Sequence, residues 1–264
     1  MNDVQNAHRI VVKVGTSTLA YANGSLNLRR IETLTRVLSD LKNSGREIVL
    51  VTSAAIGVGA AQLGMKERPR DVGGKQAAAA VGQCELMYTY DKLFSEYGHQ
   101  TAQLLLTRDV IEDPRRKQNV VNTLTRLLEL GVLPIINEND TVAIDELEFG
   151  DNDTLSAIVA ILSGAELLVL LTDIDGLYTA NPRRDPNARR IDVVDEITDE
   201  LVAAAGGAGS PLGTGGMSTK LHAASLATAA GIPTVVMSGE QPEGLYDLLD
   251  GRQVGTIFTV KENA

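Results

Sequence analysis

Short runs of apolar residues alternate along this chain with longer segments whose apolar residues recur every three or four positions. A short continuous run is typical of a strand buried on both faces, whereas the longer spacing is typical of a helix with one buried face. The pattern predicts strands at Arg9–Val14, Ile48–Thr52, Thr101–Leu106, Val132–Ile136, Leu167–Leu171, Thr234–Met237 and Thr256–Thr259. It predicts helices at Leu28–Asn43, Lys75–Tyr97 and Gln118–Leu130, from about Asn152 to Leu162, and at Met217–Ala230 and Glu243–Leu249.

Strands that alternate with helices indicate an α/β fold with helices on both faces of a mostly parallel sheet. We therefore predict a three-layer αβα sandwich. The sequence contains no internal repeat or clear linker, so we expect a single domain over residues 1–264. Polar candidate residues occur in both halves. They predict a substrate lobe over about residues 1–165 and a nucleotide lobe over about residues 166–264.

The composition excludes several classes of protein. The 264 residues can bury a substantial core. The 24 Lys and Arg against 34 Asp and Glu give a formal net charge of −10, which argues against a general nucleic-acid binder, since phosphate contacts need a basic surface. No apolar run approaches the roughly 20 residues of a membrane-spanning helix, and the N-terminus lacks the pattern of a signal peptide. We therefore expect a cytoplasmic protein with neither a nucleic acid nor a membrane as partner.

Cysteine and histidine offer little chemistry here. The single cysteine, Cys84, excludes an internal disulfide and a cysteine-rich metal site, and its place in an alanine-rich helix predicts a small buried side chain. His8, His99 and His222 show no metal-ligand spacing and are interpreted as incidental. We therefore predict no metal site built from protein side chains.

Residues 135–160 concentrate Asn and Asp in two short clusters. The first, with Asn137 and Asp140, follows a predicted strand. The second, Asn152 and Asp153, opens a predicted helix, where either side chain could cap free N–H groups. In an α/β fold both clusters would lie beside the carboxyl ends of strands, where small ligands usually bind. Asn and Asp are also ordinary turn residues, but the repetition favours a polar site.

Two other predicted strands end in residues that suit an anion. Lys13 interrupts the first apolar run near its carboxyl end, and Gly15 follows. The lysine could extend to the surface along its stem, or direct its charge at an anion above the Gly15 N–H group. Ser53 opens a segment of small residues that reaches Gly59, whose N–H groups could face a ligand. A purely structural role for these glycines is the alternative.

A glycine-rich segment at residues 206–216 leads directly into the predicted helix that begins at Met217. Free N–H groups and the positive end of the helix dipole converge at such a junction, which suits phosphate. The spacing differs from that of a Walker A motif. A flexible surface loop is the alternative interpretation.

Seven segments occur in order along the chain: VVKVGTSTL, VTSAAIGVG, AAAAVGQ, NENDTVA, FGDNDTLSAIVA, LTDIDGLYTANPR and GTGGMSTKLHAA. Together they resemble the glutamate 5-kinases, a family of the amino acid kinase fold, in the form without an extra C-terminal domain. The resemblance implies ATP-dependent phosphorylation of the side-chain carboxylate of L-glutamate, the first step of proline biosynthesis, with Mg²⁺ as cofactor. It also implies proline as an inhibitor. We expect a homo-oligomer, and because an acyl phosphate hydrolyses readily, we expect the product to pass to the next enzyme of the pathway.

The resemblance assigns roles position by position. Lys13 and Lys220 are expected to contact the phosphates and the transferring group, and Asp153 is expected to orient them. From the sequence pattern itself we expect neither lysine to lie in the core. Glutamate is expected to bind at Ser53, Asp140 and Asn152, with Asn137 nearby. The nucleotide is expected at Lys13, Gly15, Thr172, Asp173, Thr214, Gly215, Gly216, Met217, Ser218, Thr219 and Lys220.

Two positions depart from the family pattern. Ala54 stands where glycine is common, which keeps the backbone N–H group but constrains φ. Asn181 replaces a common aspartate and changes one expected nucleotide contact. The acidic segment Val142–Phe149, between the two polar clusters, is expected to move when the pocket fills.

Two other functions stay open. The nearer one is a phosphotransferase of the same fold acting on N-acetylglutamate, aspartate, carbamate, a phosphonate or UMP. Asp140 favours a substrate with a free α-ammonium group, which UMP and N-acetylglutamate lack. The second is a non-catalytic amino-acid sensor, which would not need to retain both lysines.

Overall fold

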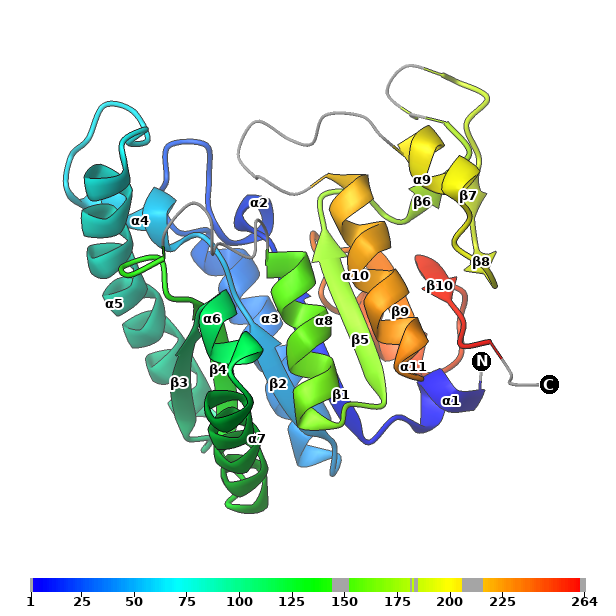
Figure 1. Ribbon diagram of the computed structural model, residues 1–264, viewed down its shortest axis with the longest axis horizontal. Coiled ribbons are helices and arrows are strands. Elements are labelled where there is room, and N and C mark those ends of the chain that lie inside the picture. Colours follow the sequence, from blue (N-terminus) through cyan, green and yellow to red (C-terminus); the bar gives the residue numbers. More distant parts are fainter. Residues whose placement is uncertain (1, 144–151, 181, 183–184, 206–215, 262–264) are drawn as a thin grey trace.

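The computed structural model describes residues 2–143, 152–180, 182, 185–205 and 216–261, and the strands in these ranges form an eight-stranded sheet (Figure 1). Every neighbouring pair in this sheet is parallel except β9 and β10. The strands in spatial order are β3 (Thr101–Leu106), β4 (Leu133–Glu138), β2 (Glu47–Val51), β1 (Arg9–Val14), β5 (Leu167–Thr172), β9 (Thr234–Ser238), β10 (Thr256–Phe258) and β8 (Val193–Val194). A separate antiparallel pair consists of β6 (Leu177–Tyr178) and β7 (Arg190–Ile191).

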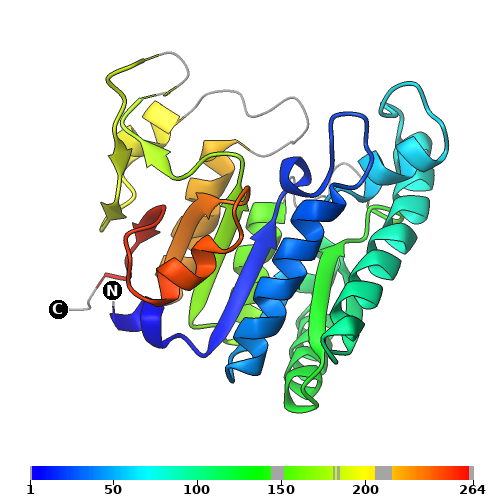
Figure 2. The ribbon, with the colours of Figure 1, turned by 180° about the vertical axis from the view of Figure 1, so that it is seen from behind.

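Helices cover both faces of the sheet, as the two opposite views show (Figures 1 and 2). One face carries α3 (Leu28–Asn43), α5 (Val72–Glu96) and α11 (Gly244–Leu249), and the other carries α7 (Pro114–Glu129), α8 (Asn152–Ser163) and α10 (Met217–Ala229). The predicted αβα sandwich with a mostly parallel sheet is confirmed. Shorter helices are α1 (Asn2–Asn6), α2 (Thr16–Leu19), α4 (Ala55–Gln62), α6 (Arg108–Glu112) and α9 (Asp199–Ala205). No helix in the described ranges is both long and apolar enough to cross a membrane.

The alternation of side chains along β1 decides which face each residue supplies. Ile10, Val12 and Val14 belong to the core shared with α3 and α5, whereas Val11 belongs to the core shared with α8 and α10. Lys13 has the same parity as Val11 and forms an ion pair with Asp153 of α8. A lysine near the carboxyl end of the central strand is thereby directed at the N-terminal end of α8.

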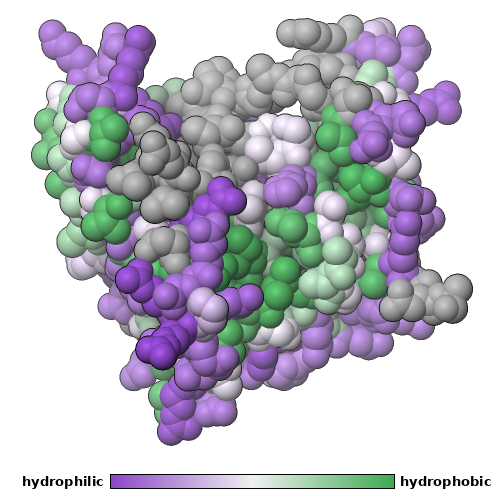
Figure 3. Space-filling view, viewed as in Figure 1, coloured by the Kyte–Doolittle hydropathy of each residue, from purple (hydrophilic) through white to green (hydrophobic). Residues whose placement is uncertain are grey.

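Helices α4 and α5 pack backbone against backbone. A Cβ atom at Gly82 would lie 1.9 Å from the carbonyl oxygen of Ala55, and one at Gly59 would lie 1.8 Å from that of Ala78. Gly59 therefore has the structural role that the sequence analysis gave as an alternative, because it allows the two helices to make this contact. The α4–α5 connection, residues 63–71, projects as a hydrophilic corner of the molecule (Figure 3).

The structure differs from the sequence predictions mainly in and around this helix pair. The small residues after Ser53 form α4 rather than an open segment. Cys84 is exposed, so its predicted burial was wrong. The reason is that an alanine-rich helix has few large side chains to indicate its buried face. That face of α5 is formed by Gly82, Gln83, Leu86, Tyr90 and Phe94.

Candidate active site

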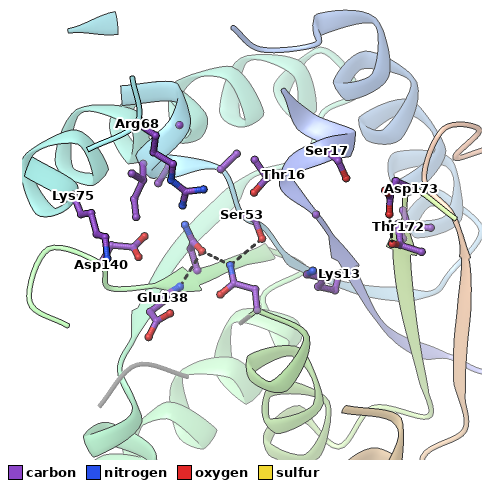
Figure 4. A pocket seen from close by; sticks show the side chains of 18 of the residues that line it. Lys13, Thr16, Ser17, Ser53, Arg68, Lys75, Glu138, Asp140, Thr172 and Asp173 are labelled. Atoms are coloured by element: carbon purple, nitrogen blue, oxygen red, sulfur yellow. Dashed lines mark hydrogen bonds between the residues drawn. The ribbon is translucent and has the colours of Figure 1, made fainter. Parts of the chain in front are cut away.

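A cleft of about 620 Å³ opens at the edge of the sheet where β1, β2, β4 and β5 end (Figure 4). The chain places β2 and β4 on one side of β1, and β5 and β9 on the other. Such a switch point is where open α/β sheets usually bind ligands. The predicted site residues that line the cleft are Lys13, Gly15, Ser53, Asn137, Asp140, Asn152, Thr172, Asp173 and Lys220.

A buried ion cluster joins β1, α8 and α10 at this edge. The Nζ atom of Lys13 lies 2.7 Å from Oδ1 of Asp153, and that of Lys220 lies 3.0 Å from Oδ2. Asp153 is completely buried, and each lysine is only 7% exposed. The expectation that both lysines lie outside the core was therefore wrong. It overlooked that α8 packs against β1 and α10 packs against α8, which brings both lysines to the buried Asp153.

The electrostatics of this cluster favour a bound anion. Burial alone would raise the pKa of Asp153, but attraction to Lys13 and Lys220 outweighs burial and lowers the pKa to about 2. The hydroxyl of Thr219 donates a further hydrogen bond to Oδ2 at 2.9 Å. With both lysines protonated, two positive charges and one negative charge leave a net charge of +1. That charge adjoins the cleft that both lysines line.

A second polar cluster connects β2, β4 and α8. The Nδ2 atom of Asn152 lies 2.6 Å from the carbonyl oxygen of Thr52, 2.9 Å from Oγ of Ser53 and 2.8 Å from Oδ1 of Asn137. Asn137 in turn donates to Oε1 of Gln83 at 2.9 Å. Gln83 is thus a supporting residue that the sequence reasoning missed. The signal for it was its position at the end of the AAAAVGQ segment.

The side chains expected to cap α8 connect it to other elements. The helix begins at Asn152, and position 151 before it lies outside the described residues. The Asn152 amide nitrogen contacts β4 and the residues that follow β2, and both Asp153 oxygens contact lysines. The polar start of α8 therefore ties together the strands at the cleft.

The residues expected to bind the nucleotide lie on the other side of the cluster. Thr172 ends β5, and its hydroxyl donates to Oδ1 of Asp173 at 3.2 Å. A Cβ atom at Gly15 would lie 3.7 Å from Nζ of Lys13. Gly216 precedes α10, whose first turn contains Met217 at the core and exposed Ser218. The structure does not describe Thr214, Gly215, Asn181 or residues 144–149 of the acidic segment.

Ala54 adopts a left-handed backbone conformation with φ of +82°. It is the only non-glycine residue of the described chain with positive φ. An L-residue in this conformation costs roughly 1–2 kcal/mol. The strain occurs where α4 begins without a side-chain cap, and the first residues of α4 line the cleft. Their free N–H groups suit an anion.

The described residues contain no group of three or more His, Cys, Asp or Glu side chains that could hold a metal ion. Within the ion cluster, both carboxylate oxygens of Asp153 already face lysines.

Comparisons with known proteins give both a family and a fold. The model of the amino acid kinase family matches residues 8–238. A glutamate 5-kinase of Clostridium perfringens is 54% identical over 98% of this chain and 98% of its own length. A glutamate 5-kinase of Listeria welshimeri is 52% identical over 99% of this chain and 96% of its own length.

Solved structures of other kinases share the fold. Carbamate kinase from Giardia lamblia bound to AMP-PNP matches with a TM-score of 0.68 at 17% identity, over 97% of this chain and 100% of that chain. The product complex of isopentenyl phosphate kinase from T. acidophilum matches with a TM-score of 0.67 at 18% identity, over 95% and 99%. At such low identity these matches show the fold alone.

We predict that Ala54→Gly raises the free energy of unfolding by about 1 kcal/mol, because glycine adopts positive φ without strain. Urea unfolding measures the change. The control is Ala60→Gly, inside the helix α4 that Ala54 precedes, which should lower stability by about 1 kcal/mol. A loss of stability in the Ala54 variant equal to that of the control would contradict the argument from strain.

We predict that Asp153→Asn lowers the free energy of unfolding by about 3–5 kcal/mol at neutral pH, because two buried ammonium groups lose their partner. The pKa of Asp153 falls from an ordinary 3.8 to about 2 in the folded protein. Its stabilising contribution is therefore complete above about pH 4 and is lost as the pH falls toward 2. Urea unfolding over this range should show that the free energies of unfolding of the variant and the wild type converge as the pH falls. Asp250→Asn, at an exposed position, is the control, and a difference that does not vary with pH would refute the assignment.

Proposed function

The chain belongs to the amino acid kinase family and, within it, to the glutamate 5-kinases, and we propose that it transfers the γ-phosphoryl group of ATP to the side-chain carboxylate of L-glutamate. The product is L-glutamyl 5-phosphate, the first intermediate of proline biosynthesis. The structural observation that supports this chemistry is the buried cluster of Lys13, Asp153 and Lys220, with its net positive charge at the cleft.

The attacking group requires no general base. A glutamate side chain has a reference pKa of about 4.3 and is already ionised at neutral pH. A carboxylate oxygen forms a bond to the γ-phosphorus while the bond from that phosphorus to the bridging oxygen breaks, and ADP leaves. The difficulty is that two anions must approach each other, so catalysis depends on positioning and on neutralising charge. We assign that neutralisation to Lys13 and Lys220, with Asp153 as the residue that positions them.

The amide and hydroxyl groups of the second polar cluster suit the amino acid. In this proposal Ser53, Asn137 and Asn152 hold glutamate, and Asp140 pairs with its α-ammonium group. UMP and N-acetylglutamate lack that group, which argues against them as substrates. A catalytically silent sensor would have no use for two lysines buried beside one carboxylate.

The nucleotide occupies the opposite side of the cleft in this proposal. Glutamate then binds mainly to the lobe of about residues 1–165, and ATP mainly to the lobe of about residues 166–264. Gly15, Thr172, Asp173 and the segment Thr214–Lys220 contact ATP. Mg²⁺ fits as an ion held by phosphate oxygens and water, as Mg²⁺ prefers, because the Asp153 oxygens are taken by lysines. Its contribution is to neutralise charge on the phosphates.

The setting of the enzyme is part of the same proposal. We place it in the cytoplasm as a homo-oligomer. Because an acyl phosphate hydrolyses readily, we also propose that the product passes to the next enzyme of the pathway.

A hydroxamate assay tests the activity, because hydroxylamine traps an acyl phosphate. We expect ATP-dependent product with glutamate and far less with N-acetylglutamate or aspartate. Lys220→Ala should lower kcat by about 10²–10³-fold, the usual loss for one electrostatic contact made in the transition state. Lys261→Ala, at an exposed position, serves as the control. Near-normal kcat in a folded Lys220 variant would exclude the role proposed for that lysine.

Proline inhibition is a separate element of the proposal. Proline shares an α-carboxylate and a charged amine with glutamate but presents no side-chain nucleophile. Bound near Ser53, Asp140 and Asn152, it should raise the apparent KM for glutamate and leave kcat unchanged. Glutamate saturation curves at several proline concentrations measure this. A fall in kcat at constant KM would place proline at another site.

A further inference from the structure

Lys75 is a cation that lines the cleft and has no partner among the residues that the structure describes. It lies in the first turns of α5 and is partly buried. Across the described residues, no hydrogen bond or ion pair involves its ammonium group. The other cations that line the cleft all have partners: Lys13 and Lys220 with Asp153, Arg70 with Glu67, and Arg68.

Backbone and side-chain contacts hold this part of α5 against the turn that carries Asp140. The Nε2 atom of Gln76, the residue after Lys75, donates to the carbonyl oxygen of Ala143 at 3.4 Å. The N–H group of Ala143 bonds back to the carbonyl oxygen of Asn139 at 3.0 Å, which closes the turn around Asp140. A carboxylate and an ammonium group are therefore held at neighbouring positions of the same cleft.

The two charges lie away from the phosphate-directed lysine. Figure 4 shows Lys75 and Asp140 at one end of the cleft and Lys13 toward the other, with Ser53 between them. A glutamate whose side-chain carboxylate faces Lys13 would direct its α-carbon toward Lys75 and Asp140. The α-carbon carries one positive and one negative group, and these two residues carry the opposite charges.

We infer that Lys75 binds the α-carboxylate of the amino acid substrate while Asp140 binds its α-ammonium group. This inference rests on the proposed function and identifies the residue that selects for a free α-carboxylate. The N–H groups at the start of α4 also suit an anion and can contact the same α-carboxylate, but they carry no full charge to compensate it, whereas Lys75 does. Lys75 is thus a specificity residue, and the phosphoryl-transfer residues are separate from it.

The substrate pair that isolates this contact is L-glutamate and its α-amide, L-isoglutamine. Both molecules present the same side-chain carboxylate, and they differ only in whether the α-carboxylate is charged. Wild-type enzyme should prefer glutamate in kcat/KM by about 10–100-fold, the range expected for one charge-assisted hydrogen bond. A coupled assay of ADP release measures both substrates.

In the Lys75→Gln variant this preference should fall to within about threefold, mainly through a higher KM for glutamate and with little change in kcat. Lys75→Arg should restore part of the preference. Lys92→Gln, at an exposed position near the other end of α5, should keep the wild-type ratio. If the glutamine variant does not fold, Lys75→Met, which keeps the aliphatic stem, provides the same comparison.

The ratio of kcat/KM for the two substrates distinguishes a failure of this inference from a failure of the proposed function. A merely structural role for Lys75 would lower activity on both substrates equally and leave the ratio unchanged, which would overturn the inference. A wild-type enzyme without activity on glutamate would overturn the proposed function itself. Activity on glutamate with an unchanged ratio in Lys75→Gln would remove the inference alone.

Discussion

A buried carboxylate is stable only where nearby positive charge compensates for its lost hydration, and Asp153 obtains that charge from Lys13 and Lys220. The three residues come from β1, α8 and α10, so the contact fixes two helix N-termini against the end of the central strand. The same contact leaves one uncompensated positive charge at the cleft. Stability of the fold and the anion binding that we propose thus depend on one cluster.

The position of this cluster follows from the geometry of the sheet. Side chains alternate along β1, which sends Lys13 to the face that α8 and α10 cover. The Asn152 amide then connects α8 to β4 and to the residues after β2. Asn152 and Asp153 are adjacent, so the first residue of α8 belongs to the polar cluster and the second belongs to the ion cluster.

The sequence was sufficient to predict the α/β sandwich, because alternating apolar runs and helical spacing depend on local neighbours alone. Repeated Asn and Asp and the interrupting Lys13 also marked the residues that the structure gathers at the cleft. Burial of the lysines and of Asp153 depended on how distant helices pack, which local patterns do not report. Gln83 and Lys75 were missed for a related reason. Both lie in an alanine-rich helix whose orientation the sequence leaves ambiguous.

The contact between Gly59 and Gly82 has a consequence for the size of the substrate. Ser53 lies two residues before α4 and Lys75 lies near the start of α5, and the backbone contact holds these helices close together. The spacing between the two helices is therefore set by a backbone contact that the absence of Cβ atoms permits. Glutamate and aspartate differ by one methylene group. A spacing that is set by backbone, rather than by flexible side chains, can distinguish two substrates that differ by that length.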